Sequence, residues 1–137
     1  MRTDLTLEDL GDFLDEPRVA VLATFRRDGS VLLSPVWHEW RGGGFNMWIV
    51  AEDVKVRHLR RDPRATAVVA ESEPPLRGVE VRGDARFIRD GVPETARRIA
   101  GRYIGEERGT AYVTSFPGDH VIVRLEPGRR PGLRFRR

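Results

Sequence analysis

The sequence predicts a mainly β protein, in which antiparallel strands form a closed or partly closed β-barrel with short helices between them. Three observations support this fold class. The chain has 137 residues, the usual size of one domain. Six segments are rich in β-branched and aromatic residues, and tight turns join several of them. Closing a sheet removes its exposed edges, so a barrel is the expected arrangement of these strands.

The six expected strands are residues 18–25, 31–40, 45–51, 64–71, 78–88 and 120–125. Asp28-Gly29 joins the first two strands as a hairpin, and the glycines at 42–44 extend the hairpin into a meander. No linker or internal repeat divides the chain. We therefore expect one domain over residues 1–137, in which about residues 127–137 form a basic C-terminal tail.

Three short helices are expected, with polar capping residues or proline at their starts and proline or glycine at their ends. The first lies between Thr6 and Pro17, the second between Glu52-Asp53 and Asp62-Pro63, and the third between Pro93 and Gly105.

Composition excludes several classes of function. The absence of cysteine excludes disulfide scaffolds, cysteine zinc sites, iron–sulfur centres and thiol nucleophiles. No apolar run approaches the roughly 20 residues that span a bilayer. The N-terminal residues also lack the apolar stretch of a secretory signal. We therefore expect a cytoplasmic protein with no membrane partner.

The net charge of +3 comes from the C-terminal end of the chain. Residues 124–137 contain six arginines and one glutamate, whereas residues 1–123 contain 18 basic and 20 acidic residues. No basic strand is interleaved with aromatic residues, as nucleic-acid-binding barrels require. A nucleic-acid partner is therefore not expected.

Motifs for hydrolysis and metal binding are also missing from the sequence. His38, His58 and His120 lie far apart, without the spacing of metal ligands. No serine lies in a nucleophile elbow, and no glycine-rich phosphate loop occurs. We therefore predict no metal site, and we assign no catalytic acid or base.

The most informative single residue is Lys55, the only lysine in the chain. It falls in the first turn of the second expected helix, where a cation opposes the helix dipole unless an anion lies beside it. In one interpretation, backbone N–H groups, Lys55 and Arg57 hold a phosphate. In the other, Glu52 and Asp53 neutralise Lys55 on a solvated surface. The residues alone leave both interpretations open.

Several segments carry a family resemblance in their order along the chain: VAVLAT at 19–24, DG at 28–29, SPVW at 34–37, KVRHLRRDPR at 55–64, VEVRGDA at 79–85, RYIG at 102–105 and VIVRLEP at 121–127. Together they resemble the pyridoxamine-phosphate-oxidase-like split-barrel superfamily, in particular its small flavin and deazaflavin oxidoreductases. The resemblance implies a six-stranded antiparallel split barrel of the FMN-binding type. It also implies a homodimer that binds FMN or the deazaflavin coenzyme F420 in a groove between its subunits.

The resemblance further implies which residues bind the cofactor. Lys55 corresponds to the phosphate-binding lysine, and Arg57 lies where a second cation can help. The full set of expected cofactor-binding residues is Ser34, Pro35, Val36, Trp37, Ile49, Val50, Lys55 and Arg57. The sequence departs from the family at Ile49 and Asp53, where hydroxyl residues are common. An acidic Asp53 would repel a phosphate, which makes tight binding of FMN less favourable.

These observations lead to two hypotheses for the function. The first is an oxidoreductase that transfers a hydride between F420 or FMN and a small organic substrate. The alternative is a non-catalytic split barrel that binds a flavin, haem or another anionic ligand. The tryptophans at 37, 40 and 48 are expected to pack in the core or in a dimer interface, and Tyr103 and Tyr112 are expected to be structural.

Overall fold

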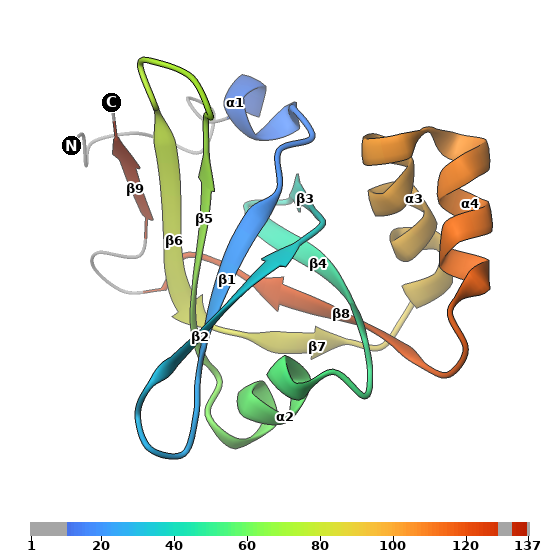
Figure 1. Cartoon of the computed structure of the whole chain (residues 1–137), viewed down its shortest axis with the longest axis horizontal. Coiled ribbons are helices and arrows are strands. Elements are labelled where there is room, and N and C mark those ends of the chain that lie inside the picture. Colours follow the sequence, from blue (N-terminus) through green and yellow to red (C-terminus); the bar gives the residue numbers. More distant parts are fainter. Residues whose placement is uncertain (1–10, 129–132, 137) are drawn as a thin grey trace.

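The computed structural model describes residues 11–128 and 133–136 and contains nine strands and four helices in this part of the chain (Figure 1). The strands are β1 (Ala20–Phe25), β2 (Val31–Val36), β3 (His38–Arg41), β4 (Gly44–Val50), β5 (Arg64–Ala70), β6 (Gly78–Asp84), β7 (Arg86–Ile88), β8 (His120–Leu125) and β9 (Leu133–Arg136). The helices are α1 (Gly11–Asp15), α2 (Val54–Arg61), α3 (Val92–Ile104) and α4 (Glu106–Ser115). None of the helices in the described part of the chain is long and apolar enough to cross a membrane.

The strands form two antiparallel sheets, of order β2-β1-β5-β6-β9 and β3-β4-β8-β7. This arrangement confirms the mainly β, split-barrel fold class. The strand count differs from the six that were expected because two expected strands are each divided between the sheets. Residues 31–40 form β2 and β3 with a break at Trp37, and residues 78–88 form β6 and β7 with a break at Ala85. Strands that change sheets in this way make the corners of packed β-sheets.

The C-terminal segment contains a further strand. Residues 133–136, part of the expected basic tail, form β9 and pair with β6 in antiparallel register. Residues 129–132 and 137 lie outside the described residues. At least this part of the C-terminal segment therefore belongs to the five-stranded sheet.

The helix ends follow the capping residues that the sequence offers. Asp53 is the N-cap of α2, where its carboxylate accepts a hydrogen bond from the backbone N–H of Lys55. Gly105 ends α3 with a φ of +89°, a conformation that favours glycine. The expected start of the first helix, at Thr6, lies outside the described residues. The sequence analysis missed α4, which begins directly after Gly105 without a side-chain cap.

Two hydrophobic clusters meet at β4, because this strand is covered on both faces. Phe45, Met47 and Ile49 point into the barrel interior. Trp48, which points the other way, packs in a second cluster with residues of α3 and α4. The helical hairpin α3–α4 stands beside the four-stranded sheet (Figure 1). The tryptophan interpretation is thus supported for Trp48, which is 9% exposed.

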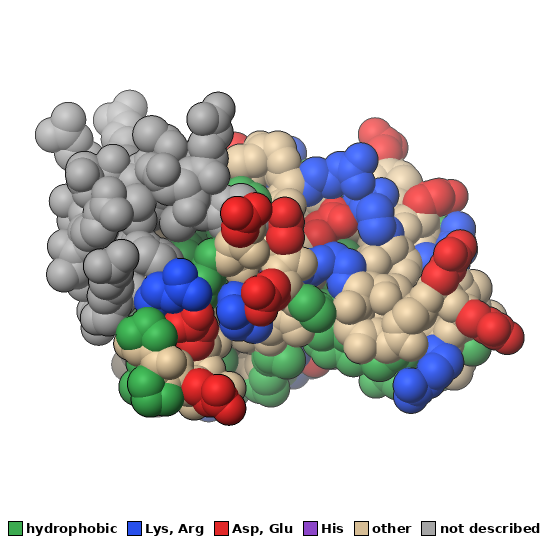
Figure 2. Space-filling view, turned by 90° about the horizontal axis from the view of Figure 1, so that it is seen from above, with side chains coloured by type: hydrophobic (Ala, Val, Ile, Leu, Met, Phe, Trp, Pro, Cys, Tyr) green, Lys and Arg blue, Asp and Glu red, His purple; other side chains and the backbone are tan. Residues whose placement is uncertain are grey.

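An ion pair between Arg98 and the buried Glu39 connects α3 to the four-stranded sheet. Arg98 donates two hydrogen bonds of 2.7 Å to the Glu39 carboxylate, and Asn46 donates a third of 2.8 Å. Burial raises the pKa of Glu39, but these hydrogen bonds outweigh burial and hold the pKa below its usual value. Elsewhere on the surface, acidic and basic side chains are intermixed, as the view from above shows (Figure 2).

Candidate functional site

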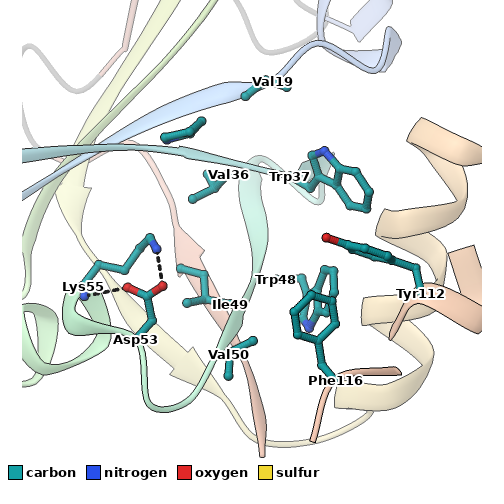
Figure 3. A pocket seen from close by; sticks show the side chains of 11 residues that line it. Val19, Val36, Trp37, Trp48, Ile49, Val50, Asp53, Lys55, Tyr112 and Phe116 are labelled. Atoms are coloured by element: carbon teal, nitrogen blue, oxygen red, sulfur yellow. Dashed lines mark hydrogen bonds and ion pairs between the residues drawn. The ribbon is translucent and has the colours of Figure 1, made fainter. Parts of the chain in front are cut away.

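An open groove of about 370 Å³ lies between β2, β4, the start of α2 and the helix α4 (Figure 3). Its size falls in the range of small-molecule pockets. The lining residues are Val19, Pro35, Val36, Trp37, Trp48, Ile49, Val50, Asp53, Lys55, Tyr112 and Phe116. Six of the eight residues that were expected to bind a cofactor are therefore brought together, namely Pro35, Val36, Trp37, Ile49, Val50 and Lys55.

Lys55 and Asp53 form the charged end of the groove. The Lys55 Nζ atom lies 2.7 Å from Asp53 Oδ2, and the Lys55 side chain is only 12% exposed. The same carboxylate accepts the backbone N–H of Lys55 at 3.1 Å. The structure thus pairs Lys55 with Asp53, as the second interpretation expected, but it places the pair in a groove and not on an open surface.

Asp53 is ionised at neutral pH. Burial raises the pKa of Asp53, but hydrogen bonds from the side chain and backbone of Lys55 outweigh burial and hold the pKa below its usual value. A negatively charged ligand at this end of the groove would therefore meet one cation and one anion. It can gain the full attraction of Lys55 only by displacing or sharing the Asp53 carboxylate.

Two expected site residues do not line this groove. Ser34 is buried and does not line the groove, whereas the next two residues of β2, Pro35 and Val36, do. Arg57 follows Lys55 by two residues on α2, so it projects from a different face of the helix. It lines a separate cleft beside the β1–β2 turn.

Aromatic side chains form the opposite end of the groove. Trp37 lies 5.3 Å from Tyr112 between ring centroids, and Trp48 lies 5.8 Å from Tyr112 and 5.5 Å from Phe116. The Tyr112 hydroxyl points from α4 toward the space between the two indoles (Figure 3). The sequence analysis assigned Tyr112 a structural role, yet its side chain is 42% exposed and lines the groove. Its spacing of four residues from Phe116 was the available signal that both share one helix face.

A buried hydrogen-bond donor lies at this aromatic end. The Trp48 Nε1 atom is buried, and no described residue accepts its hydrogen bond. Burying a donor without an acceptor is costly, so this atom lowers the stability of the aromatic cluster. The groove therefore combines a cation with an aromatic surface, which fits an anionic cofactor with a planar ring.

The histidines lie outside the groove. His38 is fully buried, and its Nε2 atom lies 2.8 Å from the carbonyl oxygen of Arg18. His58 and His120 line two other clefts. Within residues 11–128 and 133–136, no three histidine, aspartate or glutamate side chains come close enough to hold a metal ion.

Comparison with known proteins identifies relatives of the whole chain. Residues 7–129 match the sequence model of the family described as pyridoxamine 5'-phosphate oxidase. No protein with a curated function matches the sequence significantly.

Solved structures share the fold over almost the full length. The conserved hypothetical protein Rv2991 from Mycobacterium tuberculosis is 28% identical, with a TM-score of 0.77 over 98% of this chain and 88% of that chain. An F420 reductase is 23% identical, with a TM-score of 0.70 over 91% of this chain and 94% of its own. HutZ, the heme storage protein from Vibrio cholerae, is 19% identical, with a TM-score of 0.72 over 98% of this chain and 94% of its own.

Proposed function

Because its sequence matches the family over residues 7–129, the chain belongs to the pyridoxamine 5'-phosphate oxidase family, and we propose that it binds F420 or FMN in the groove as an oxidoreductase. The cofactor, when bound, supplies the hydride for a small organic substrate. The observation that carries the proposal is the groove itself, in which Lys55 lies at one end and the aromatic residues lie at the other. The similar F420 reductase structure supports it.

Each part of the groove has a role in this proposal. Lys55 attracts the anionic part of the cofactor, and the backbone of residues 35–37 lines its ring system. Trp48 offers an indole surface against which the ring system can pack. Trp37, Tyr112 and Phe116 exclude water from the space where cofactor and substrate meet.

We also propose that the protein is a homodimer whose second subunit completes the groove. An apolar surface covers the outer face of the five-stranded sheet, where Leu33, Val68 and Leu76 are 65%, 37% and 57% exposed. Leu33 and Pro35 both point outward from β2, so this surface continues to the groove. The tryptophans at 37, 40 and 48 are expected in the core or in a dimer interface, and the outer sheet face would add to such an interface. An exposed apolar patch of this kind is typical of an interface.

Sedimentation of the full chain at micromolar concentration tests the dimer. We expect a dimer for the wild type and a shift toward monomer for Leu33→Glu. Val31→Glu is the control, because Val31 also points outward from β2 but does not line the apolar surface. This variant should shift the equilibrium between dimer and monomer less. A monomer at all concentrations would contradict both the dimer and a groove between subunits.

Absorbance of the purified protein, followed by titration with F420, FMN and haem, tests the proposed function. We expect F420 or FMN to bind and to quench tryptophan fluorescence, because Trp37 and Trp48 line the groove. Hydride transfer to or from a bound cofactor would then be followed at its absorbance band. Failure of both cofactors to bind would contradict the proposal.

The alternative function is non-catalytic binding of a ligand such as haem. The similarity to the heme storage protein is the reason for including haem in the titration. Haem iron requires an axial ligand from the protein. No histidine lines the groove, so Tyr112 is the residue among its lining side chains that could supply one. Haem binding that persists in Tyr112→Phe would place the haem elsewhere on the protein.

A further inference from the structure

A second cleft, of about 640 Å³, lies between the β1–β2 turn and α2, on a different face of α2 from Lys55. Its lining residues are Arg26, Arg27, Asp28, Leu32, Val54, Arg57, His58 and Arg61. We refer to it as the arginine cleft. The four residues of α2 recur at positions i, i+3, i+4 and i+7, so they form one face of the helix. Figure 1 shows the β1–β2 turn beside α2, and Arg61 donates a 2.7 Å hydrogen bond to the carbonyl of Phe25 across this gap.

The positive charge of the arginine cleft is not neutralised by the described part of the protein. Arg26 bonds only to Ser30 Oγ and the carbonyl of Val31, and Arg61 to a carbonyl. Arg27 and Arg57 have no hydrogen bond or ion pair with any described residue. The single carboxylate, Asp28, already accepts hydrogen bonds from the backbone and hydroxyl of Ser30.

Several arginines elsewhere in the described part of the chain pair with a carboxylate, unlike those that line the arginine cleft. Arg64 pairs with Asp62 at 2.7 Å, and Arg98 with Glu39 at 2.7 Å. On the face seen from above, blue basic and red acidic side chains alternate (Figure 2). The arginine cleft therefore gathers four guanidinium groups, none of which pairs with a carboxylate of the described residues.

The pKa of His58 depends on the electrostatic potential inside the arginine cleft. It is 7% exposed, and its Nδ1 atom lies 3.0 Å from Thr24 Oγ1. Burial lowers the pKa of His58, and the charges of Arg61, Arg26 and Arg57 lower it further, while Asp53 opposes them. Burial and, to a smaller extent, the positive charges thus favour the neutral imidazole, and a bound anion would offset the contribution of these charges.

We propose that the arginine cleft binds a small molecule that carries two or more phosphate or carboxylate groups. Guanidinium groups bind such oxyanions through paired, charge-assisted hydrogen bonds, and several arginines favour several anionic groups. The volume suits a small molecule. No tryptophan, tyrosine or phenylalanine side chain lines the cleft among the described residues, which disfavours single-stranded nucleic acid, whose bases stack on such rings. This proposal is independent of the proposed F420 or FMN site in the groove beside Lys55, because the groove and the arginine cleft share no lining residue.

Calorimetric titration of the full chain with tripolyphosphate and with citrate tests the proposal. Inorganic phosphate and acetate, which carry one phosphate or one carboxylate group, are the comparison ligands. We expect at least one polyanion to bind about tenfold or more tightly than its single-group counterpart. Arg27→Gln and Arg57→Gln should each weaken this binding by about tenfold. The matched control is Arg89→Gln with Arg97→Gln, which removes two arginines from a different cleft and should leave the affinity unchanged.

A second measurement locates the bound anion. The pKa of His58, followed by NMR of its imidazole protons, should rise when the polyanion is added. Lys55→Ala should leave polyanion binding unchanged, so failure of this site and failure of the flavin site give different results. The proposal is overturned if neither polyanion binds, if the His58 pKa does not move, or if the Arg89→Gln, Arg97→Gln variant weakens binding equally. It is also overturned if a DNA duplex binds more tightly than every small polyanion and competes with it.

Discussion

The Lys55 ammonium group and the Asp53 carboxylate lie 2.7 Å apart at one end of the groove between β2, β4 and α4. Their pairing joins the two interpretations that the sequence left open, because Lys55 is neutralised by Asp53 and still lines a ligand-sized groove. A bound anion must therefore compete with the Asp53 carboxylate for the Lys55 ammonium group.

Lys55→Ala should weaken binding of F420 or FMN by one to two decades, as expected for losing a charge-assisted contact of roughly 1.5–3 kcal/mol. The free energy of unfolding should change by about 1 kcal/mol or less, because the Asp53 side chain is 34% exposed and water can solvate its carboxylate once the lysine is removed. Fluorescence titration and urea unfolding measure the two effects. Arg57→Ala is the matched comparison, because Arg57 lines the arginine cleft instead of the groove. Unchanged affinity in Lys55→Ala would show that the lysine does not bind the cofactor.

Asp53→Ser should strengthen FMN binding more than F420 binding. The FMN phosphate monoester carries more charge than a phosphodiester, so an ionised carboxylate opposes it more, by on the order of 1–4 kcal/mol at a partly exposed site. Serine also caps a helix well, so α2 should stay intact. Parallel titrations with both cofactors measure the ratio of affinities. Glu52→Ser removes a neighbouring charge that does not line the groove and should leave the ratio unchanged. An equal ratio in Asp53→Ser and wild type would exclude Asp53 from cofactor selection.

The stability of the fold should fall as the pH is lowered from about 6.5 to about 4 because of His38. Burial lowers the pKa of His38 to about 4, and the nearby Arg102 charge adds to this effect. Since the unfolded chain takes up a proton near pH 6.5 and the folded chain does not, the loss approaches about 3 kcal/mol over this range. Urea unfolding at several pH values measures it. His38→Gln should show a smaller pH dependence above pH 5, whereas a His38 imidazole that titrates near pH 6.5 in the folded protein would contradict the prediction.

Gly109→Ala should destabilise the protein by about 1–3 kcal/mol and move α4 away from α3. A Cβ atom at Gly109 would lie 2.7 Å from the Gly101 backbone nitrogen, which cannot move without shifting α3. Because α4 carries Tyr112 and Phe116, ligand binding in the groove should weaken as well. Gly101→Ala is the control, since its Cβ would lie 3.6 Å from Glu106 and helix propensity favours alanine by up to about 1 kcal/mol. Thermal unfolding that ranks Gly101→Ala below Gly109→Ala would refute this account of the helix contact.

The features that the sequence predicted correctly depend on local chemistry. Gly29 has a φ of +86° in the β1–β2 turn, as Asp28-Gly29 indicated, and Asp53 caps α2. The breaks at Trp37 and Ala85 were missed because neither residue is a strand breaker, and the change of sheet is set by barrel closure. The helix α4 was missed because packing against Gly101 compensates for its weak apolar pattern. Tyr112 consequently could not be placed in the groove.

The pairing of β4 with β8 joins residues 45–50 to residues 120–125, across most of the chain. During synthesis, β4 can pair with β3 at once, but its other edge has no partner until β8 has left the ribosome. Pairing between such distant segments is slow, and the unpaired edge of β4 promotes aggregation until β8 pairs with it. Ribosome-stalled chains that end before residue 120 should therefore bind chaperones more strongly than chains that include β8.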